Sequence, residues 1–484
     1  MHKLNVIGIT TVKYFYLFII ENRVIIDTNE QELRAFMNEN WLQRKFSPNS
    51  TRIQDHRSPF QRDRARILHS AAFRRLQAKT QVMGVGVSDF YRTRLTHSLE
   101  AAQIGSGISA QLRNKYSELA EKLFPNDDAL IEAICLAHDI GHPPFGHGGE
   151  VALNFMMHKD GGFEGNGQTF RIVSKLEPYT ESYGMDLTRR TLLGFLKYPQ
   201  TLQHLQSSYP LTLPNNYRQL KASDWHPPKG IYEDDLDMLY WVLEPLSYSD
   251  RERFQSSIAR DNDHRKTQFK SLDCSMMELA DDIAYGVHDL EDAIVTGVVS
   301  RHLFEEYVTK PLAEIDDAWV QDHYQALTEK LFSQQHHLQK DAIGSLVNYL
   351  ITSIALVDLN TTQGTDFSED LLRYNAKLSA APATVLGLLK DFVYRFVIKQ
   401  TDIQRLEYKG QQIVMELFEA FASDPERLLP ESTRRRWQKV ADDGQNPNRV
   451  IADYLSGMTD EFATRVYNNL FIANASGVNE KHCV

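Results

Sequence analysis

Residues 136–150 of the chain read LAHDIGHPPFGHGGE, a stretch with three histidines, one aspartate and one glutamate. Imidazole and carboxylate groups together suit a divalent transition metal or magnesium. The residues just before the first histidine are apolar, so the ionisable groups extend from a segment that we expect to be buried. Because buried charges are costly unless they are paired or bound to a metal, this stretch predicts a site.

The same stretch predicts the end of a helix. Neighbouring side chains on a helix diverge by about 100°, so His138 and Asp139 can reach one ion only near a helix end. Gly141 and Pro143 supply that end. A His-Asp pair by itself is a weak signal, because such pairs arise by chance in any proteome.

Composition bounds the class of protein. The 484 residues are 42% hydrophobic and 24% charged, which is typical of a globular protein and allows two or three domains by length. The net charge of −11 argues against a nucleic-acid packaging protein but leaves room for a local basic groove. The three cysteines have neither disulfide-type nor metal-type spacing, which favours a reducing, cytoplasmic location.

Helical periodicity dominates the chain and strand-like alternation is scarce, so we expect an all-α fold. Proline and glycine mark loops at 141–149, 161–167 and 210–230, and the polar segment 247–270 is expected to be an exposed loop or lid. Further helices are expected between 315 and 471. The best-defined helices are expected over 62–80, 94–116, 129–139, 148–157, 169–177, 188–196 and 275–298.

The N-terminal 36 residues are expected to lie outside the folded domain, with Met37 as an alternative start. Their continuous apolar run, 14–20, is too short to span a bilayer. No small-residue cleavage site follows it, so a secretory signal is not indicated. We therefore expect no membrane association.

Two other segments add candidate ligands. His97 lies three residues after Arg94 and shares a helix face with it, although a surface histidine beside a surface arginine fits that spacing equally well. Asp281 begins a stripe that continues through Tyr285 and Asp289, for which an exposed acidic face is the plain alternative. Together with His138 and Asp139, His97 and Asp281 form a ligand set that leaves room for water or a phosphate oxygen.

Two features bear on phosphate chemistry. His147 and Glu150 are spaced so that the carboxylate can orient the imidazole for general acid–base catalysis. The chain has no phosphate-binding loop of the Gly-x-x-x-x-Gly-Lys-Ser/Thr type, so phosphate would be held by a metal and by cations. Solvent exposure or ion pairing is the alternative for most of these cations, which are Arg62, Arg64, Arg66, Arg74, Arg75, Lys79, Arg92, Arg94, Lys197 and Lys229.

The order His…His-Asp…Asp resembles the HD-domain metal phosphohydrolases, and the surrounding words are similar to those of bacterial deoxyguanosine triphosphate triphosphohydrolases. The similarity runs from about residue 40 to 472. Between Glu150 and Phe163 the chain lacks the long insertion of the enterobacterial enzymes, so it looks more like the triphosphohydrolase-like branch. The words that carry the resemblance are 73–82, 93–100, 138–147, 163–166, 280–285 and 453–460.

This resemblance implies a metal-dependent hydrolase that converts dGTP, and other dNTPs, to deoxynucleoside and inorganic triphosphate with Mg²⁺ or Mn²⁺. It implies metal ligation by His97, His138, Asp139 and Asp281. It implies catalysis by His147, Glu150 and His142. The substrate contacts that it implies are Gln81, Arg94, Asn166, Lys197, Tyr198, Lys229, Tyr285 and Asp289.

The resemblance also implies an HD-domain helical fold with a C-terminal helical extension. The expected division is an N-terminal extension over 1–36, a catalytic core over 37–310 and a helical region over 311–484. Family members form homo-oligomers, often hexamers, and some respond to single-stranded DNA or to effector dNTPs.

Two other functions stay open. An HD phosphodiesterase acting on another nucleotide is disfavoured because the chain has no Gly-Tyr-Pro signature and carries the Thr80-Gln81 word. A non-enzymatic nucleotide sensor is disfavoured because His147 and Glu150 are both present.

Overall fold

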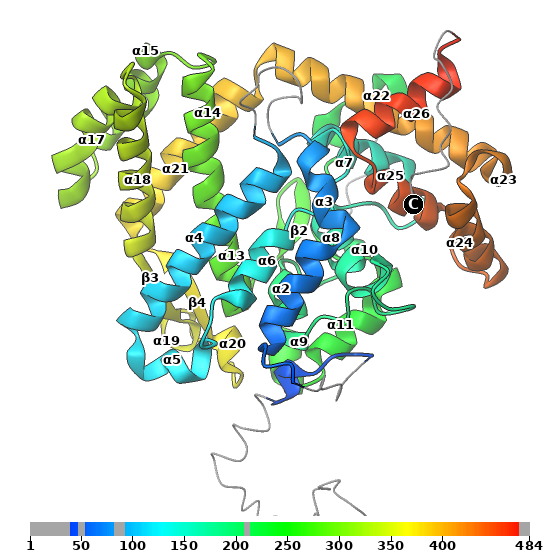
Figure 1. The fold of residues 1–484 in the computed structure, drawn as a ribbon, viewed down its shortest axis with the longest axis horizontal. Helices are drawn as coiled ribbons and strands as arrows, with labels where there is room; N and C mark the ends of the chain where they lie inside the picture. The colour runs from blue at the N-terminus through cyan, green and yellow to red at the C-terminus, as the bar shows by residue number, and fades with distance from the viewer. Residues whose placement is uncertain (1–38, 47–53, 82–91, 208–212, 474–484) are drawn as a thin grey trace, which may run out of the picture.

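The computed structural model describes residues 39–46, 54–81, 92–207 and 213–473 (Figure 1). The expectation for residues 1–36 concerns a segment outside the described residues. As predicted, the described fold is built almost wholly of helices, with two small two-stranded sheets. Within the described residues, no helix is long and apolar enough to cross a membrane.

The helices fall in chain order as follows. Those of the first part are α2 Pro59–His69, α3 Ala71–Arg75, α4 Arg94–Lys115, α5 Ser117–Leu123, α6 Ala129–Ala137, α7 Gly146–Met156, α8 Gly165–Arg171, α9 Arg189–Phe195, α10 Leu202–Leu205, α11 Leu236–Leu243, α12 Tyr248–Phe254, α13 Leu272–Ile283 and α14 Asp289–Val295. Those of the second part are α15 Arg301–Phe304, α16 Lys310–Ala313, α17 Ala318–Leu331, α18 His336–Thr352, α19 Leu359–Gln363, α20 Asp370–Arg373, α21 Ala380–Val393, α22 Thr401–Ser423, α23 Pro425–Leu428, α24 Glu431–Asp442, α25 Asn448–Ser456 and α26 Asp460–Phe471.

Side-chain caps explain where several of these helices begin. Thr93 caps α4 by accepting a hydrogen bond from the Thr96 amide, so α4 starts where the sequence predicts. The helix expected over 62–80 is instead broken at Ser70, which has an extended backbone and accepts from the Phe73 amide. A cap inside an apolar-periodic run therefore begins a new helix, which periodicity alone does not reveal.

Other boundaries differ from expectation near the site. Helix α7 begins at Gly146, inside the loop expected over 141–149, after Phe145 adopts the left-handed conformation with φ of 63°. Helix α8 begins at Gly165, because Glu164 caps it by accepting from the Gly167 amide. The helix expected over 275–298 begins earlier, at Leu272, and contains a π-helical turn, η6 Ala284–His288.

The polar segment 247–270 is exposed for much of its length, as expected, but it is not a loop. It contains α12 and an antiparallel hairpin of β1 Ser257–Arg260 with β2 Asp263–Thr267. The second hairpin pairs β3 Ile354–Asp358 with β4 Tyr374–Leu378. Both hairpins depend on contacts between side chains of paired strands, which the amino-acid composition does not predict.

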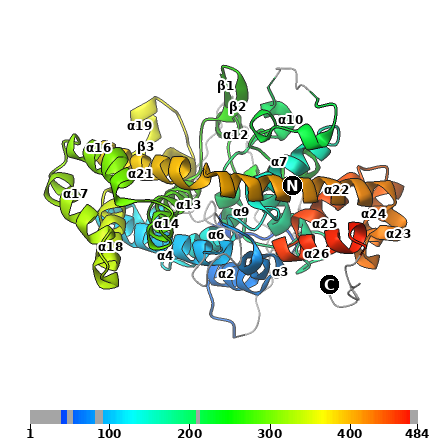
Figure 2. The same cartoon turned by 90° about the horizontal axis from the view of Figure 1, so that it is seen from above.

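Two hydrophobic cores organise the molecule. The larger core surrounds α4, α6 and α13, and includes Ile104, Ile134 and Ala280. The smaller core joins α7 to the C-terminal helices, with Leu153 packed in the same cluster as Phe418 of α22 and Ile451 of α25. Helix α22 lies across one face of the molecule (Figure 2), where it packs against α7, α25 and α26. The C-terminal helices thus share a core with the segment that carries His147 and Glu150, while the division at residue 310 stays a prediction.

Candidate metal centre and active site

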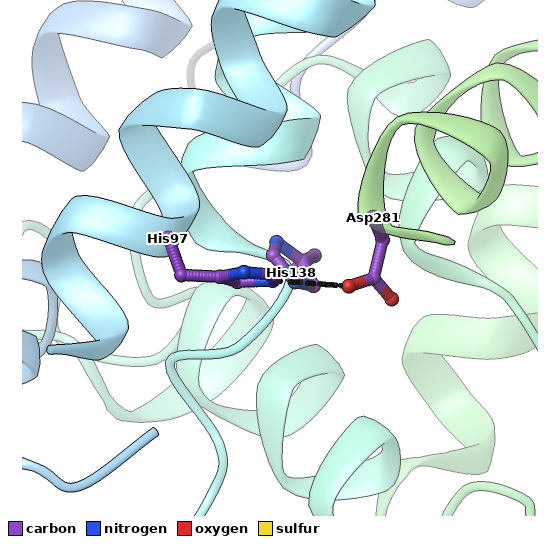
Figure 3. Close-up of side chains that lie close together, drawn as sticks. All are labelled: His97, His138 and Asp281. Atoms are coloured by element: carbon purple, nitrogen blue, oxygen red, sulfur yellow. Dashed lines mark hydrogen bonds and ion pairs between the residues drawn. The ribbon is translucent and has the colours of Figure 1, made fainter. Parts of the chain in front are cut away.

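Three helices bring His97, His138 and Asp281 together (Figure 3). His97 extends from α4, His138 follows the last residue of α6, and Asp281 lies on α13. One ligand atom from each lies within 4.8 Å of the others, as a shared metal ion requires. Asp281 Oδ1 is 3.1 Å from His97 Nε2 and 3.5 Å from His138 Nε2.

The imidazole of His138 is oriented for metal binding. Its Nδ1 lies 2.6 Å from the Cys135 carbonyl oxygen. Because a carbonyl can only accept, Nδ1 donates this hydrogen bond, and Nε2 is the ring nitrogen that remains to bind a metal once it has lost its proton. Nε2 is buried and has no hydrogen-bond partner. A ligand histidine fixed through its other ring nitrogen is the usual arrangement at a metal site, so the residues present fit a metal.

Asp139 lies beside this trio. Its Oδ2 accepts a hydrogen bond of 2.6 Å from Arg94, and its Oδ1 is 3.4 Å from His138 Nε2. Burial opposes its ionisation, but the neighbouring imidazoles and the Arg94 guanidinium hold its pKa well below the usual range. Asp139 is therefore a buried carboxylate that stays charged at the edge of the cluster.

The charges of the trio favour a bound cation. Burial also opposes ionisation of Asp281, but His138 and His97 keep its pKa well below the usual range. Burial would lower the pKa of His138, but the adjacent carboxylates raise it to about 9. Without a metal the site therefore holds protons, and metal binding to such ligands releases them.

A second group of ionisable residues flanks the trio. His147 Nδ1 lies 3.3 Å from Glu150 Oε2, and the His147 side chain is 66% exposed whereas that of Glu150 is 3% exposed. Glu150 also accepts from the Gly165 amide at 2.8 Å and lies 3.3 Å from Lys229 Nζ. Burial disfavours its charge, but Lys229 and His147 hold its pKa well below the usual range. His142 Nδ1 is 3.1 Å from Asp139 Oδ1, which connects the two groups.

A cavity of about 890 Å³ opens onto these residues. Its size is that of a small-molecule site. Twelve of the residues that the sequence analysis singled out line it: Gln81, Arg94, His138, Asp139, His142, His147, Asn166, Lys197, Tyr198, Lys229, Asp281 and Tyr285. His97 and Glu150 lie behind this lining, in contact with Asp281 and His147.

Asp289 is the exception. It is only 4% exposed and is not among the residues that line the cavity. The expected stripe from Asp281 assumed a regular α-helix, whereas the π-helical turn η6 intervenes. Such a turn is wider than an α-helical one, so the residues after it leave the predicted face. The structure therefore does not bring Asp289 to the cavity.

The other wall of the cavity comes from the C-terminal helices, which sequence reasoning missed. Asp460 falls in a word that carried the family resemblance, but its position gave no sign of a place in the site. The residues of this wall include Tyr394, Glu407, Lys409, Asp460, Glu461, Thr464, Arg465 and Asn468.

Comparisons with known proteins agree with this architecture. A family model described as HD domain matches residues 94–189, and one described as phosphohydrolase-associated domain matches residues 376–469. A deoxyguanosinetriphosphate triphosphohydrolase-like protein of Shewanella loihica is 61% identical over 439 residues, covering 90% of this chain and 98% of the relative. Proteins of the same description from Shewanella sediminis and Shewanella pealeana are 60% and 59% identical, covering 91% and 90% of this chain and 98% and 97% of those relatives. The predicted resemblance is thereby confirmed, and the chain belongs to the deoxyguanosinetriphosphate triphosphohydrolase-like protein family.

Proposed function

We propose that this protein is a metal-dependent dNTP triphosphohydrolase that cleaves dGTP, and other dNTPs, to deoxynucleoside and inorganic triphosphate. The observation that carries the proposal is the His97–His138–Asp281 trio, in which the buried Nε2 of His138 makes no hydrogen bond, at the wall of a nucleotide-sized cavity. The names of the relatives point to the same reaction.

In this proposal His97, His138, Asp139 and Asp281 hold Mg²⁺ or Mn²⁺. Such an ion, when bound, supplies Lewis-acid stabilisation of charge on a phosphoryl oxygen. Asp139, which is buried, and Asp281, which is partly buried, both stay ionised, and this supports their assignment as ligands.

His147 is assigned the proton transfer. The buried Glu150 carboxylate accepts from His147 Nδ1, which leaves His147 Nε2 to take or give a proton at the substrate. Glu150 orients the ring. His142 is assigned to the surroundings of the reacting phosphate, since it contacts Asp139 and lines the same cavity.

The remaining residues are assigned to substrate binding. Arg94, Lys197 and Lys229 surround the cavity with positive charge suited to a triphosphate. Gln81, Tyr198, Tyr285 and Asn166 are assigned to the sugar and its neighbourhood. Asp289 is buried outside the cavity and is not assigned a substrate contact.

Product analysis tests the reaction. Purified protein with Mn²⁺ or Mg²⁺ is incubated with dGTP, then with each other dNTP singly and in mixtures, and the products are resolved by ion-exchange chromatography. We expect inorganic triphosphate and deoxynucleoside. Asp139→Ala is expected to abolish turnover, whereas Asp402→Asn, at a carboxylate 88% exposed on α22, is expected to retain it.

The outcomes separate the alternatives. Release of pyrophosphate or orthophosphate would reject the triphosphohydrolase assignment and favour another HD phosphohydrolase. Tight dNTP binding without turnover would favour a sensor. Turnover only in mixtures would support an effector dNTP. The homo-oligomeric state, a response to single-stranded DNA and a cytoplasmic location stay predictions.

A further inference from the structure

Asp460, the first residue of α26, contacts two separate segments of the active site. Asp460 is only 7% exposed. Its Oδ1 accepts a hydrogen bond of 3.0 Å from the Phe145 amide. Its Oδ2 accepts one of 3.0 Å from the Thr80 amide and a shorter one from the Thr80 hydroxyl. One carboxylate from the C-terminal region thus holds two segments that lie far from it in the sequence.

The first of these segments is a strained turn. Phe145 has a φ of 63°, a conformation that non-glycine residues adopt only when their surroundings enforce it. It directly precedes α7, whose first two turns carry His147 and Glu150. The direction of α7, and so the position of both side chains, depends on what holds Phe145.

Helix α22 packs against the Phe145 turn from a second side. A Cβ atom built on Gly410 would lie 2.2 Å from Phe145 Cβ, so only glycine lets α22 approach this closely. On α7, a Cβ atom on Gly148 would lie 2.4 Å from the Glu407 carbonyl oxygen of α22. Backbone contact on this scale leaves the turn little freedom to move toward α22.

The second segment leads to Gln81 and to the start of α4. Thr80 pairs with Thr93 as an isolated antiparallel bridge, and the Arg94 amide donates to the Lys79 carbonyl at 3.3 Å. The hydrogen bonds that fix Thr80 therefore also restrain Thr93, which directly precedes Arg94. Gln81 directly follows Thr80 and lines the cavity.

Lys79 supplies a parallel connection. Its Nζ donates to the His142 carbonyl at 2.6 Å and to the Ser456 carbonyl at 2.8 Å. Lys79 is only 2% exposed, so both hydrogen bonds lie in the interior. Ser456 is the last residue of α25, so its carbonyl has no partner within that helix. This lysine joins the turn, the Thr80 segment and the C-terminal helices.

We propose that Asp460 is a positioning residue that fixes the 142–147 turn relative to the Thr80–Gln81 segment, so that the C-terminal region completes the catalytic geometry. The aspartate is required because both of its oxygens accept hydrogen bonds from buried donors. An asparagine could accept at one oxygen only, and its amide group would face a backbone N–H. The proposal rests on the proposed function for its kinetic test alone.

Amide hydrogen exchange of the full chain tests the positioning without reference to activity. We expect Asp460→Asn to speed exchange about tenfold to hundredfold in both 142–150 and 76–81, as the loss of a hydrogen bond to a charged group predicts. Exchange elsewhere should match the wild type and the matched control Asp402→Asn. Exchange within twofold of wild type in either segment overturns the proposal. An equal rise throughout the protein also overturns it, because that result marks a general loss of stability.

A second variant decides the matter if Asp460→Asn does not fold. Thr80→Val keeps the side-chain shape and removes one donor to Asp460. We expect about threefold to tenfold faster exchange in 142–150, although the substitution lies in the other segment. Unchanged exchange in 142–150 would show that the segments are not coupled through Asp460.

Kinetics with dGTP supply the functional arm. We expect Asp460→Asn to lower kcat about tenfold to hundredfold while the Mn²⁺ affinity of the nucleotide-free protein stays within twofold. The metal trio comes from α4, the end of α6 and α13, whereas Asp460 accepts its hydrogen bonds from Phe145 and Thr80, which lie outside these helices. A parallel loss of Mn²⁺ affinity would overturn the positioning role. If the wild type releases no triphosphate, the proposed function fails and the exchange result still stands.

Discussion

Gly105→Ala tests the helix packing that places two of the trio. Gly105 lies on α4, where a Cβ atom would meet Cys135 Sγ at 2.9 Å and Ile131 Cγ1 at 3.1 Å, both on α6. Ordinary contacts lie at about 3.5–4.0 Å, so the helices must separate by roughly 0.5–1 Å. Overpacking of this kind costs about 1–3 kcal/mol, and the helix propensity of alanine returns about 1 kcal/mol. The net effect is a fall in the free energy of unfolding of about 1 kcal/mol, with about 2 kcal/mol as the upper bound.

We also expect Gly105→Ala to bind metal more weakly than the wild type. His97 precedes Gly105 on α4, and His138 follows Cys135 at the end of α6. Separation of the two helices therefore moves the two imidazoles apart. Because ligand geometry tolerates only about 0.5 Å of error, we expect Mn²⁺ to bind roughly tenfold more weakly in isothermal titration calorimetry.

Cys135→Ala supplies the control, because it removes the atom that the new methyl group would meet. A double-mutant cycle from urea denaturation of the metal-free protein should give a favourable coupling of about 1–2 kcal/mol, with Mn²⁺ affinity restored in the double variant. The reasoning is refuted if Gly105→Ala is as stable as the wild type, or if Cys135→Ala recovers neither stability nor affinity.

Two further predictions concern stability, and urea denaturation checks both. Gly344 lies within α18, and a Cβ atom added there would have no neighbouring atom within 4 Å among the described residues. Gly344→Ala should therefore raise the free energy of unfolding by about 0.5–1 kcal/mol, and a decrease would contradict the described packing. Burial is the main cause that lowers the pKa of Lys79 from 10.5 to about 7. Between these two pKa values, the Lys79 side chain is protonated in the unfolded chain but not in the folded protein. The free energy of unfolding therefore rises with pH across this range. From pH 7 to about pH 10, the free energy of unfolding of the wild type should rise relative to that of Lys79→Met by up to about 1.4 kcal/mol per pH unit. If the difference between the two proteins is flat or falls with pH, Lys79 stays charged.

Part of the site was predictable because its residues lie in short motifs with diagnostic chemistry. The sequence indicated four candidate metal ligands, and the structure brings three of them, His97, His138 and Asp281, together, with Asp139 beside them. Helix α4 begins at Arg94, as helical periodicity predicts, and the end of α6 lies next to the Gly-Pro segment that predicts it. Capping and periodicity act over a few residues, so the sequence carries them directly.

Other features depended on the tertiary structure. Asp289 leaves the expected face because a π-helical turn precedes it, and periodicity assumes a regular helix. Ser70 divides an expected helix, and the segment 247–270 forms a helix and a hairpin. The Ser70 cap and the pairing of β1 with β2 are features of the folded chain that helical periodicity does not describe.

By itself, the sequence determined that the chain is helical and which family it belongs to, and it indicated the four candidate metal ligands His97, His138, Asp139 and Asp281. These depend on short-range backbone preferences and on the ligand chemistry of short motifs. Only the tertiary structure decided that the far wall of the cavity is built by α22 and α26, and that Asp460 holds both Phe145 and Thr80. Contacts across hundreds of residues are set by how the two cores pack, and no local pattern records that packing.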